Sequence, residues 1–135
     1  MSIEREKPLI LVVEDDEATG EVITLTIDQE TPYRSHTVTS GRDALRFLLQ
    51  SSDRPALLIL DYRLPDLTGT ELMDRLQQIP TLKHIPILLM SATTRKDEIE
   101  ARSAVIMEKP FDLDELITTI EKLVTPPRSV ESLPS

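Results

Sequence analysis

Leu9-Ile-Leu-Val-Val13 is a continuous apolar run, and the four residues that follow it are Glu14-Asp15-Asp16-Glu17. A short apolar run rich in β-branched residues is typical of a strand that is buried on both faces of a parallel sheet. Three later runs have the same character and also stop at polar residues: 56–60 before Asp61, 86–90 before Ser91, and 104–107 before Glu108-Lys109. The sequence therefore predicts four buried strands, each with a chemically reactive or charged residue at or just beyond its carboxyl end.

Amphipathic segments separate these strands. Apolar residues at helical spacing predict helices at about 16–29, 41–50, 70–79 and 112–124, with Asp16 as the N-cap of the first, and a short, marginal helix at 95–103. A weaker, half-exposed strand is expected at 34–39. Strands and helices that alternate in this way predict an α/β protein, a three-layer sandwich with a five-stranded parallel sheet between two layers of helices.

Composition and charge exclude several classes of protein. The chain has 135 residues, a net charge of −9 and no cysteine, so it has no disulfide framework, thiolate zinc site or cysteine nucleophile. The acidic balance and the absence of Trp argue against binding to nucleic acid, and favour basic partners or cations. Because no apolar run approaches the ~20 residues of a membrane span, and no signal peptide is visible, we expect a cytoplasmic protein without membrane contact.

The expected domain organisation is simple. Residues 1–7 are predicted to be an N-terminal extension, residues 8–124 one domain, and the Pro- and Ser-rich residues 125–135 a disordered tail.

The strand ends carry the chemistry. In a parallel sheet they meet at one edge, so Glu14, Asp15, Asp61, Ser91 and Lys109 are expected to share one rim. Like charges brought this close raise their pKa values or bind a cation, and an all-oxygen site suits Mg²⁺ or Mn²⁺. Asp15 and Asp61 would be direct ligands, and Glu14 would act through water. A carboxylate is also a nucleophile toward phosphorus, and a lysine and a hydroxyl could stabilise the transferred phosphoryl group.

Four motifs in this order resemble those of response-regulator receiver domains of two-component signalling. They are Leu11-Val-Val-Glu-Asp-Asp-Glu17, Leu60-Asp-Tyr-Arg-Leu-Pro-Asp66 with Gly69, Ser91-Ala92, and Lys109-Pro-Phe111. The resemblance covers about residues 8–124. It implies a flavodoxin-like fold with strand order 2-1-3-4-5, and a phosphoryl group taken from a histidine kinase or a phosphotransfer protein.

The resemblance also implies a role for each matching residue. Asp61 is the phosphoacceptor, and Asp15, Asp61 and the backbone carbonyl of Arg63 bind Mg²⁺ (or Mn²⁺), with Glu14 completing the acidic pair. Ser91 and Lys109 bind the phosphoryl group and take part in the switch. The side chains of Arg63 and Thr93 are expected to tune the lifetime of the phosphorylated state. The Lys109–Pro110 bond is cis or trans; the sequence leaves its isomer open.

Two departures from the family pattern concern the output of the signal. Ile106 stands where the family often has a Tyr or Phe that swings inward on activation, and an aliphatic side chain does not reproduce that movement. In addition, only 18 positions separate Ser91 from Lys109, which implies a short fourth helix next to the face that receivers commonly use for output or dimerisation.

The expected function is that of a stand-alone receiver resembling chemotaxis regulators. It would be a phosphoacceptor rather than an enzyme, limited to Mg²⁺-dependent self-phosphorylation and self-dephosphorylation, and would signal by protein–protein contact, with homodimerisation left open. A receiver-like adaptor that works without phosphorylation is the alternative. An aspartyl-phosphate hydrolase of another α/β family is disfavoured, because it needs a second acid where this chain has Arg63.

Overall fold

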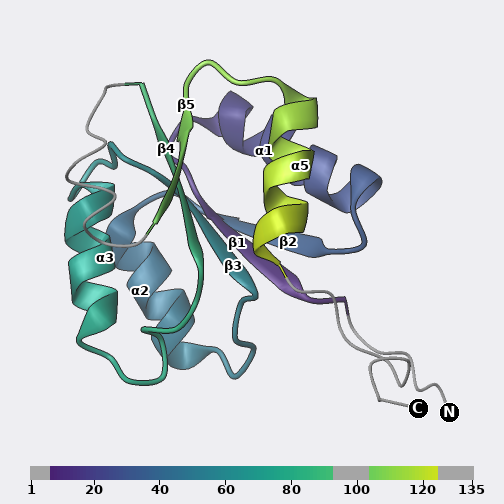
Figure 1. The fold of residues 1–135 in the computed structure, drawn as a ribbon. Coiled ribbons are helices and arrows are strands. Elements are labelled where there is room, and N and C mark those ends of the chain that lie inside the picture. The colour runs from purple at the N-terminus through teal and green to yellow at the C-terminus, as the bar shows by residue number, and fades with distance from the viewer. Residues whose placement is uncertain (1–6, 93–103, 125–135) are drawn as a thin grey trace, which may run out of the picture.

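The computed structural model describes residues 7–92 and 104–124, which form a parallel sheet with helices on both faces (Figure 1). The strands are Leu9–Val13 (β1), Arg34–Val38 (β2), Leu57–Asp61 (β3), Ile87–Ser91 (β4) and Val105–Glu108 (β5). The helices are Glu17–Glu30 (α1), Gly41–Gln50 (α2), Gly69–Gln77 (α3) and Leu113–Leu123 (α5). The strand order β2-β1-β3-β4-β5 confirms the predicted flavodoxin-like fold.

Several expectations concern parts of the chain that the structure does not describe. The short fourth helix expected at 95–103, Thr93, the tail at 125–135 and residues 1–6 of the N-terminal extension all lie outside the described residues.

Each face of the sheet has its own hydrophobic core. Successive side chains of a strand point to opposite faces, so Ile10 and Val12 of β1 belong to one core while Leu11 and Val13 belong to the other. The first core takes its helical residues from α1 and α5, namely Ile23, Ile27, Leu116 and Ile120. The second takes them from α2 and α3, namely Ala44, Leu48, Leu72, Met73 and Leu76. Figure 1 shows these two helix pairs on opposite sides of the sheet.

Polar side chains determine where the described helices begin. At each N-cap a side-chain oxygen accepts a backbone hydrogen bond from the first turn: Asp16 for α1, Ser40 for α2, Thr68 for α3 and Asp112 for α5. Asp16 and Asp112 are caps that the sequence predicts. For α3 the arrangement is a full capping box, because Glu71 also accepts the N–H of Thr68. Helix α3 therefore begins directly after the loop that follows β3.

The register of the strands brings the polar residues to one edge of the sheet. Val13 is paired with Leu60, so Glu14 and Asp61 are the next residues along two neighbouring strands. Ser91 ends β4, which lies between β3 and β5. The carboxyl ends of β1, β3, β4 and β5 are therefore adjacent, as the parallel topology requires.

The Lys109–Pro110 peptide bond is cis. No helix within the described residues is long and apolar enough to cross a membrane.

Candidate functional site

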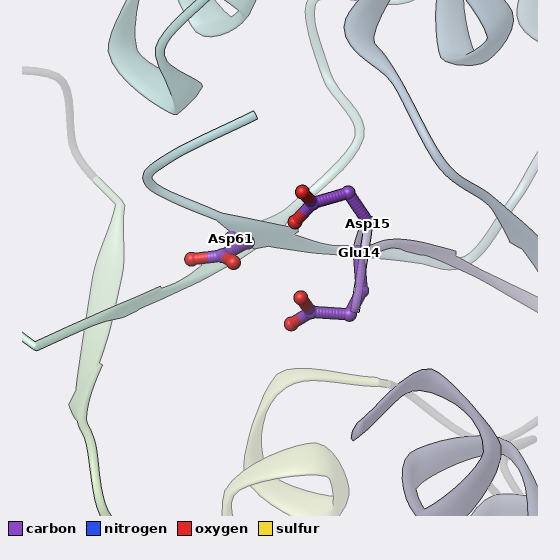
Figure 2. A group of neighbouring side chains, drawn as sticks. All are labelled: Glu14, Asp15 and Asp61. Atoms are coloured by element: carbon purple, nitrogen blue, oxygen red, sulfur yellow. The ribbon is translucent and has the colours of Figure 1, made fainter. Parts of the chain in front are cut away.

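Three carboxylates from two neighbouring strand ends meet at this edge. Glu14 and Asp15 follow β1, and Asp61 is the last residue of β3. One carboxylate oxygen from each lies within 4.8 Å of the other two. Figure 2 shows Glu14 and Asp15 extending from the end of β1 toward Asp61. Glu14 and Asp61 are buried, at 1% and 8% exposure, whereas Asp15 is exposed. The cluster is therefore open to solvent on the side of Asp15.

Lys109 supplies a positive charge to this cluster. Its Nζ lies 3.3 Å from Asp61 Oδ2 and 3.5 Å from Glu14 Oε1. The backbone N–H of Lys109 donates to the carbonyl of Ser91 at 2.9 Å, which fixes the residue just beyond β5 against the end of β4. One ammonium group thus bridges the two buried carboxylates, and the structure brings together four of the residues that the sequence places at the rim.

Burial shifts the protonation of Glu14. The pKa of this carboxyl is raised from 4.5 to about 7, chiefly by loss of hydration and also by the neighbouring Asp61, while the Asp16 backbone N–H and Lys109 act in the opposite direction. The single ammonium group of Lys109 therefore does not fully neutralise the negative charge of the three carboxylates. A carboxyl that titrates near neutrality because it is buried beside another acid is characteristic of a functional site.

Ser91 and Ile106 have different surroundings. Ser91 is 1% exposed and lies in β4 directly after Met90, which pairs with Asp61, so Ser91 belongs to the strand end next to Asp61. Ile106, at the position without the aromatic residue, is half-buried and packs against the core on the α2 and α3 side. The structure therefore places Ser91 near the carboxylates and leaves Ile106 as part of the hydrophobic packing of β5.

The loop at 62–68 carries Arg63, the sequence-predicted carbonyl ligand. Its backbone N–H points back to Asp61 Oδ1 at 3.4 Å, while its side chain is exposed. The loop closes where the N–H of Gly69 donates to the carbonyl of Tyr62 at 2.6 Å. A Cβ on Gly69 would lie 3.0 Å from the backbone oxygen of Asp61, so glycine allows α3 to start this close to Asp61.

Sequence reasoning missed the role of Asp66 in this loop. Its two carboxylate oxygens accept the N–H groups of Gly41 at 2.9 Å and Arg42 at 2.8 Å. Although burial alone would raise the pKa of Asp66, these hydrogen bonds outweigh burial and lower it. The residue was visible only as part of a motif, because an Asp that caps a helix normally directly precedes that helix in the sequence.

The donor set fits a hard divalent cation. All three side chains of the cluster offer carboxylate oxygens, the ligands that Mg²⁺ prefers. The three oxygen atoms lie within 4.8 Å of one another, which is near enough for one cation to contact them. Glu14, Asp15 and Asp61 are therefore the candidate ligands of such a cation.

The fold and this site define a class of protein, and the comparison with family models agrees with it. Residues 10–121 match the model of the response regulator receiver domain. The chain belongs to this family. Receiver domains bind Mg²⁺ at an acidic pocket, interact with histidine kinases or phosphotransfer proteins, and are generally not conventional enzymes.

The chain is also similar in sequence to individual response regulators. The chain is 31% identical over 121 residues to the phosphate regulon transcriptional regulatory protein PhoB of Rhizobium meliloti (strain 1021), covering 87% of this chain and 52% of PhoB. It is 34% identical over 112 residues to response regulator Rcp1 of Synechocystis sp. (strain ATCC 27184 / PCC 6803 / Kazusa), covering 75% of this chain and 74% of Rcp1. The chain thus spans about half the length of PhoB and about three quarters of Rcp1.

Solved structures of response regulators have the same fold as this chain. The chemotaxis response regulator CheY4 of Vibrio cholerae superposes with a TM-score of 0.80 at 25% identity, covering 87% of this chain and 99% of CheY4. The Mn²⁺-bound form of response regulator Rcp1 superposes with a TM-score of 0.72 at 26% identity, covering 90% of this chain and 99% of Rcp1.

Proposed function

We propose that Asp61 accepts a phosphoryl group from a histidine kinase or a phosphotransfer protein, with Mg²⁺ or Mn²⁺ as cofactor. The phosphorylated protein then signals by binding another protein. The observation that carries this proposal is the placement of Lys109, whose ammonium group lies 3.3 Å from the Asp61 carboxylate inside the three-acid cluster. A buried carboxylate next to a fixed cation and a metal-binding acid pair is suited to phosphoryl transfer.

In the proposed phosphoryl transfer, Asp61 is the nucleophile and its neighbours hold the cation. A carboxylate oxygen of Asp61 attacks phosphorus, a phosphorus–oxygen bond forms, and the phosphorus–nitrogen bond to the donor histidine breaks. Asp15, Asp61 and the Arg63 carbonyl would hold the cation, with Glu14 acting through water. When bound, the cation would neutralise charge on the phosphoryl oxygens. The Mn²⁺-bound form of Rcp1 shows that a relative with this fold binds such a cation.

Lys109 and Ser91 act on the phosphoryl group itself. In the unphosphorylated protein Lys109 stays between Asp61 and Glu14, at 3.3 and 3.5 Å. Once Asp61 is converted to an acyl phosphate, its negative charge moves outward onto the phosphoryl oxygens, and the ammonium group follows it. The buried Ser91 at the adjacent strand end is placed to donate its hydroxyl hydrogen to a phosphoryl oxygen. This exchange of partners is the step that converts phosphorylation into a structural change.

Arg63 and Thr93 are proposed to set the lifetime of the phosphorylated state. The Arg63 side chain is exposed beside the acceptor, where it can restrict the approach of water to phosphorus. Apart from self-phosphorylation by small donors and this self-dephosphorylation, we assign no catalytic activity to the domain.

One observation favours a second candidate, an adaptor that works without phosphorylation. Ile106 packs into the core and offers no aromatic group to move when Asp61 is modified. In such an adaptor the acidic cluster would remain in the fold but would not be phosphorylated. It predicts constitutive binding to its partner and no phosphoryl adduct.

The deciding experiment is intact-mass spectrometry after incubation with acetyl phosphate or phosphoramidate. We expect one phosphoryl adduct that requires Mg²⁺ and is absent from Asp61→Asn. Asp53→Asn is the matched control, because Asp53 pairs with Arg34 at the start of β2, on the opposite edge of the sheet, and should leave the adduct intact. Following adduct decay in Arg63→Ala and Thr93→Ala tests the lifetime assignment. No adduct with either donor would contradict the proposal and favour the adaptor.

A further inference from the structure

The middle of the loop at 62–68 is fastened to a helix that begins 20 or more residues earlier in the sequence. Asp66 Oδ1 accepts from Gly41 N at 2.9 Å, and Asp66 Oδ2 accepts from Arg42 N at 2.8 Å. Both donors belong to the first turn of α2, whose N-cap Ser40 already accepts from Asp43 N at 3.0 Å. Asp66 is therefore a tertiary contact added to a helix that has its own cap.

An apolar contact reinforces this connection. A Cβ on Gly41 would lie 2.8 Å from both Cγ and Cδ1 of Leu67, so the Leu67 side chain occupies the space that a larger residue at 41 would need. We refer to the contacts of Asp66 and Leu67 with Gly41 and Arg42 as the α2 latch. Its polar half uses charge-assisted hydrogen bonds, and its apolar half depends on the missing Cβ.

The latch acts on a loop whose ends are already fixed. Tyr62 N donates to Met90 O at 2.8 Å, and Gly69 N donates to Tyr62 O at 2.6 Å. Arg63 and Thr68 face each other across an antiparallel bridge. With both ends held at the sheet edge, the α2 latch fixes the orientation of the closed loop, and hence of the Arg63 backbone three residues before Asp66.

We propose that Asp66 is a positioning residue for the cation site, holding the loop so that the Arg63 carbonyl faces the position between Asp15 and Asp61. This inference rests on the proposed function, because the carbonyl matters only if a cation binds there. Asp66 acts through the loop and not at the cation. Outer partners that orient metal ligands typically contribute ten-fold or more to affinity.

The test is an Mg²⁺ titration followed by the amide NMR signals of Asp15 and Arg63 in the full chain. We expect Asp66→Asn to raise the Kd for Mg²⁺ about ten-fold. Ser40→Ala is the matched control: it removes a cap from the same helix turn without touching the loop, and should change the Kd less than two-fold. Gly41→Ala places a Cβ against Leu67 and disturbs the apolar half of the α2 latch, so it should also weaken Mg²⁺ binding. This second variant tests the inference if Asp66→Asn does not fold.

The outcomes separate the inference from the proposed function. If Asp66→Asn and Gly41→Ala bind Mg²⁺ as tightly as the unaltered chain, Asp66 is only a second helix cap and the inference is wrong. It is also wrong if Ser40→Ala weakens binding as much as Asp66→Asn, because the effect then follows helix stability. If the unaltered chain neither binds Mg²⁺ nor forms an adduct, the proposed function fails, and the inference fails with it.

Discussion

At the scale of single residues, Glu14 is the group whose ionisation depends most on its surroundings. It is 1% exposed, and its pKa is raised from 4.5 to about 7, chiefly by loss of hydration. Because the folded chain binds this proton more tightly than the unfolded chain, the contribution of Glu14 to stability is full below pH 4.5 and is lost as the pH rises through about 7. The unfolding free energy of the metal-free protein should therefore fall between these values.

Glu14→Gln should remove most of that pH dependence. A glutamine retains a carbonyl oxygen for the N–H of Asp16 but has no charge to desolvate. We expect the variant to be more stable than the unaltered chain at pH 8 without divalent cations, by roughly 1–3 kcal/mol, and to differ little at pH 4.5. Urea unfolding at both pH values is the measurement. Glu21→Gln on the exposed side of α1 removes the same charge and should keep the original slope; an unchanged slope in Glu14→Gln would contradict the prediction.

The sequence predicted the positions of some site residues better than the contacts of others. Glu14, Asp61 and Lys109 follow apolar runs, and parallel topology brings such strand ends together without knowledge of any loop. Asp66 could not be assigned in this way, because its partners at Gly41 and Arg42 are set by the path of the loop. The raised pKa of Glu14 likewise depends on burial that the sequence pattern does not specify.

At the scale of secondary structure elements, the edge strand β2 shows how a side chain completes the sheet. Asp28 of α1 accepts both the backbone N–H of Ser35, at 3.1 Å, and its hydroxyl hydrogen, at 3.0 Å. A free N–H on an edge strand is a point at which another chain can pair. The alternation of residues 34–39 predicted the strand but not this contact, because Asp28 belongs to a different element.

Asp28→Ala should therefore weaken the fold and expose the edge. Two hydrogen bonds are lost from β2, so we expect a decrease of about 1–2 kcal/mol in the unfolding free energy, measured by urea denaturation. Size-exclusion chromatography over a concentration series should show more self-association than in the unaltered chain. Glu30→Ala, which removes a similar charge from the exposed end of the same helix, serves as control. Equal stability of Asp28→Ala and the control would show that the contact is replaced by water at no cost.

At the scale of the whole molecule, the fold follows from the order of its elements, whereas the output does not. Alternating apolar runs and amphipathic helices allow few topologies, and the five-stranded parallel sheet is the one observed. From the sequence we expect output at the face next to the region after β4, and residues 93–103 lie outside the described part of the chain. Ile106 shows only that the aromatic side chain common in the family is replaced by core packing.

The response to cations also belongs to the whole molecule, because a chain with a net charge of −9 can be stabilised in two ways, by cation binding at a specific site and by general screening of its surface charge. A specific site adds RT ln(1 + [Mg²⁺]/Kd), which is about 1.4 kcal/mol at ten times the Kd and corresponds to several degrees in Tm. Screening instead depends on ionic strength alone. We therefore expect Mg²⁺ to raise the Tm well above the value in NaCl of equal ionic strength, as followed by circular dichroism.

Variants of the site distinguish the two contributions. Asp61→Asn and Asp15→Asn should each lose most of the Mg²⁺-specific increase, because each removes one carboxylate of the three-acid cluster. Asp53→Asn changes the net charge by the same amount at the opposite edge of the sheet and should keep the increase. If NaCl alone reproduces the effect, or if Asp61→Asn retains it, then Mg²⁺ stabilises this protein by screening its surface charge, and Asp61 is not a ligand.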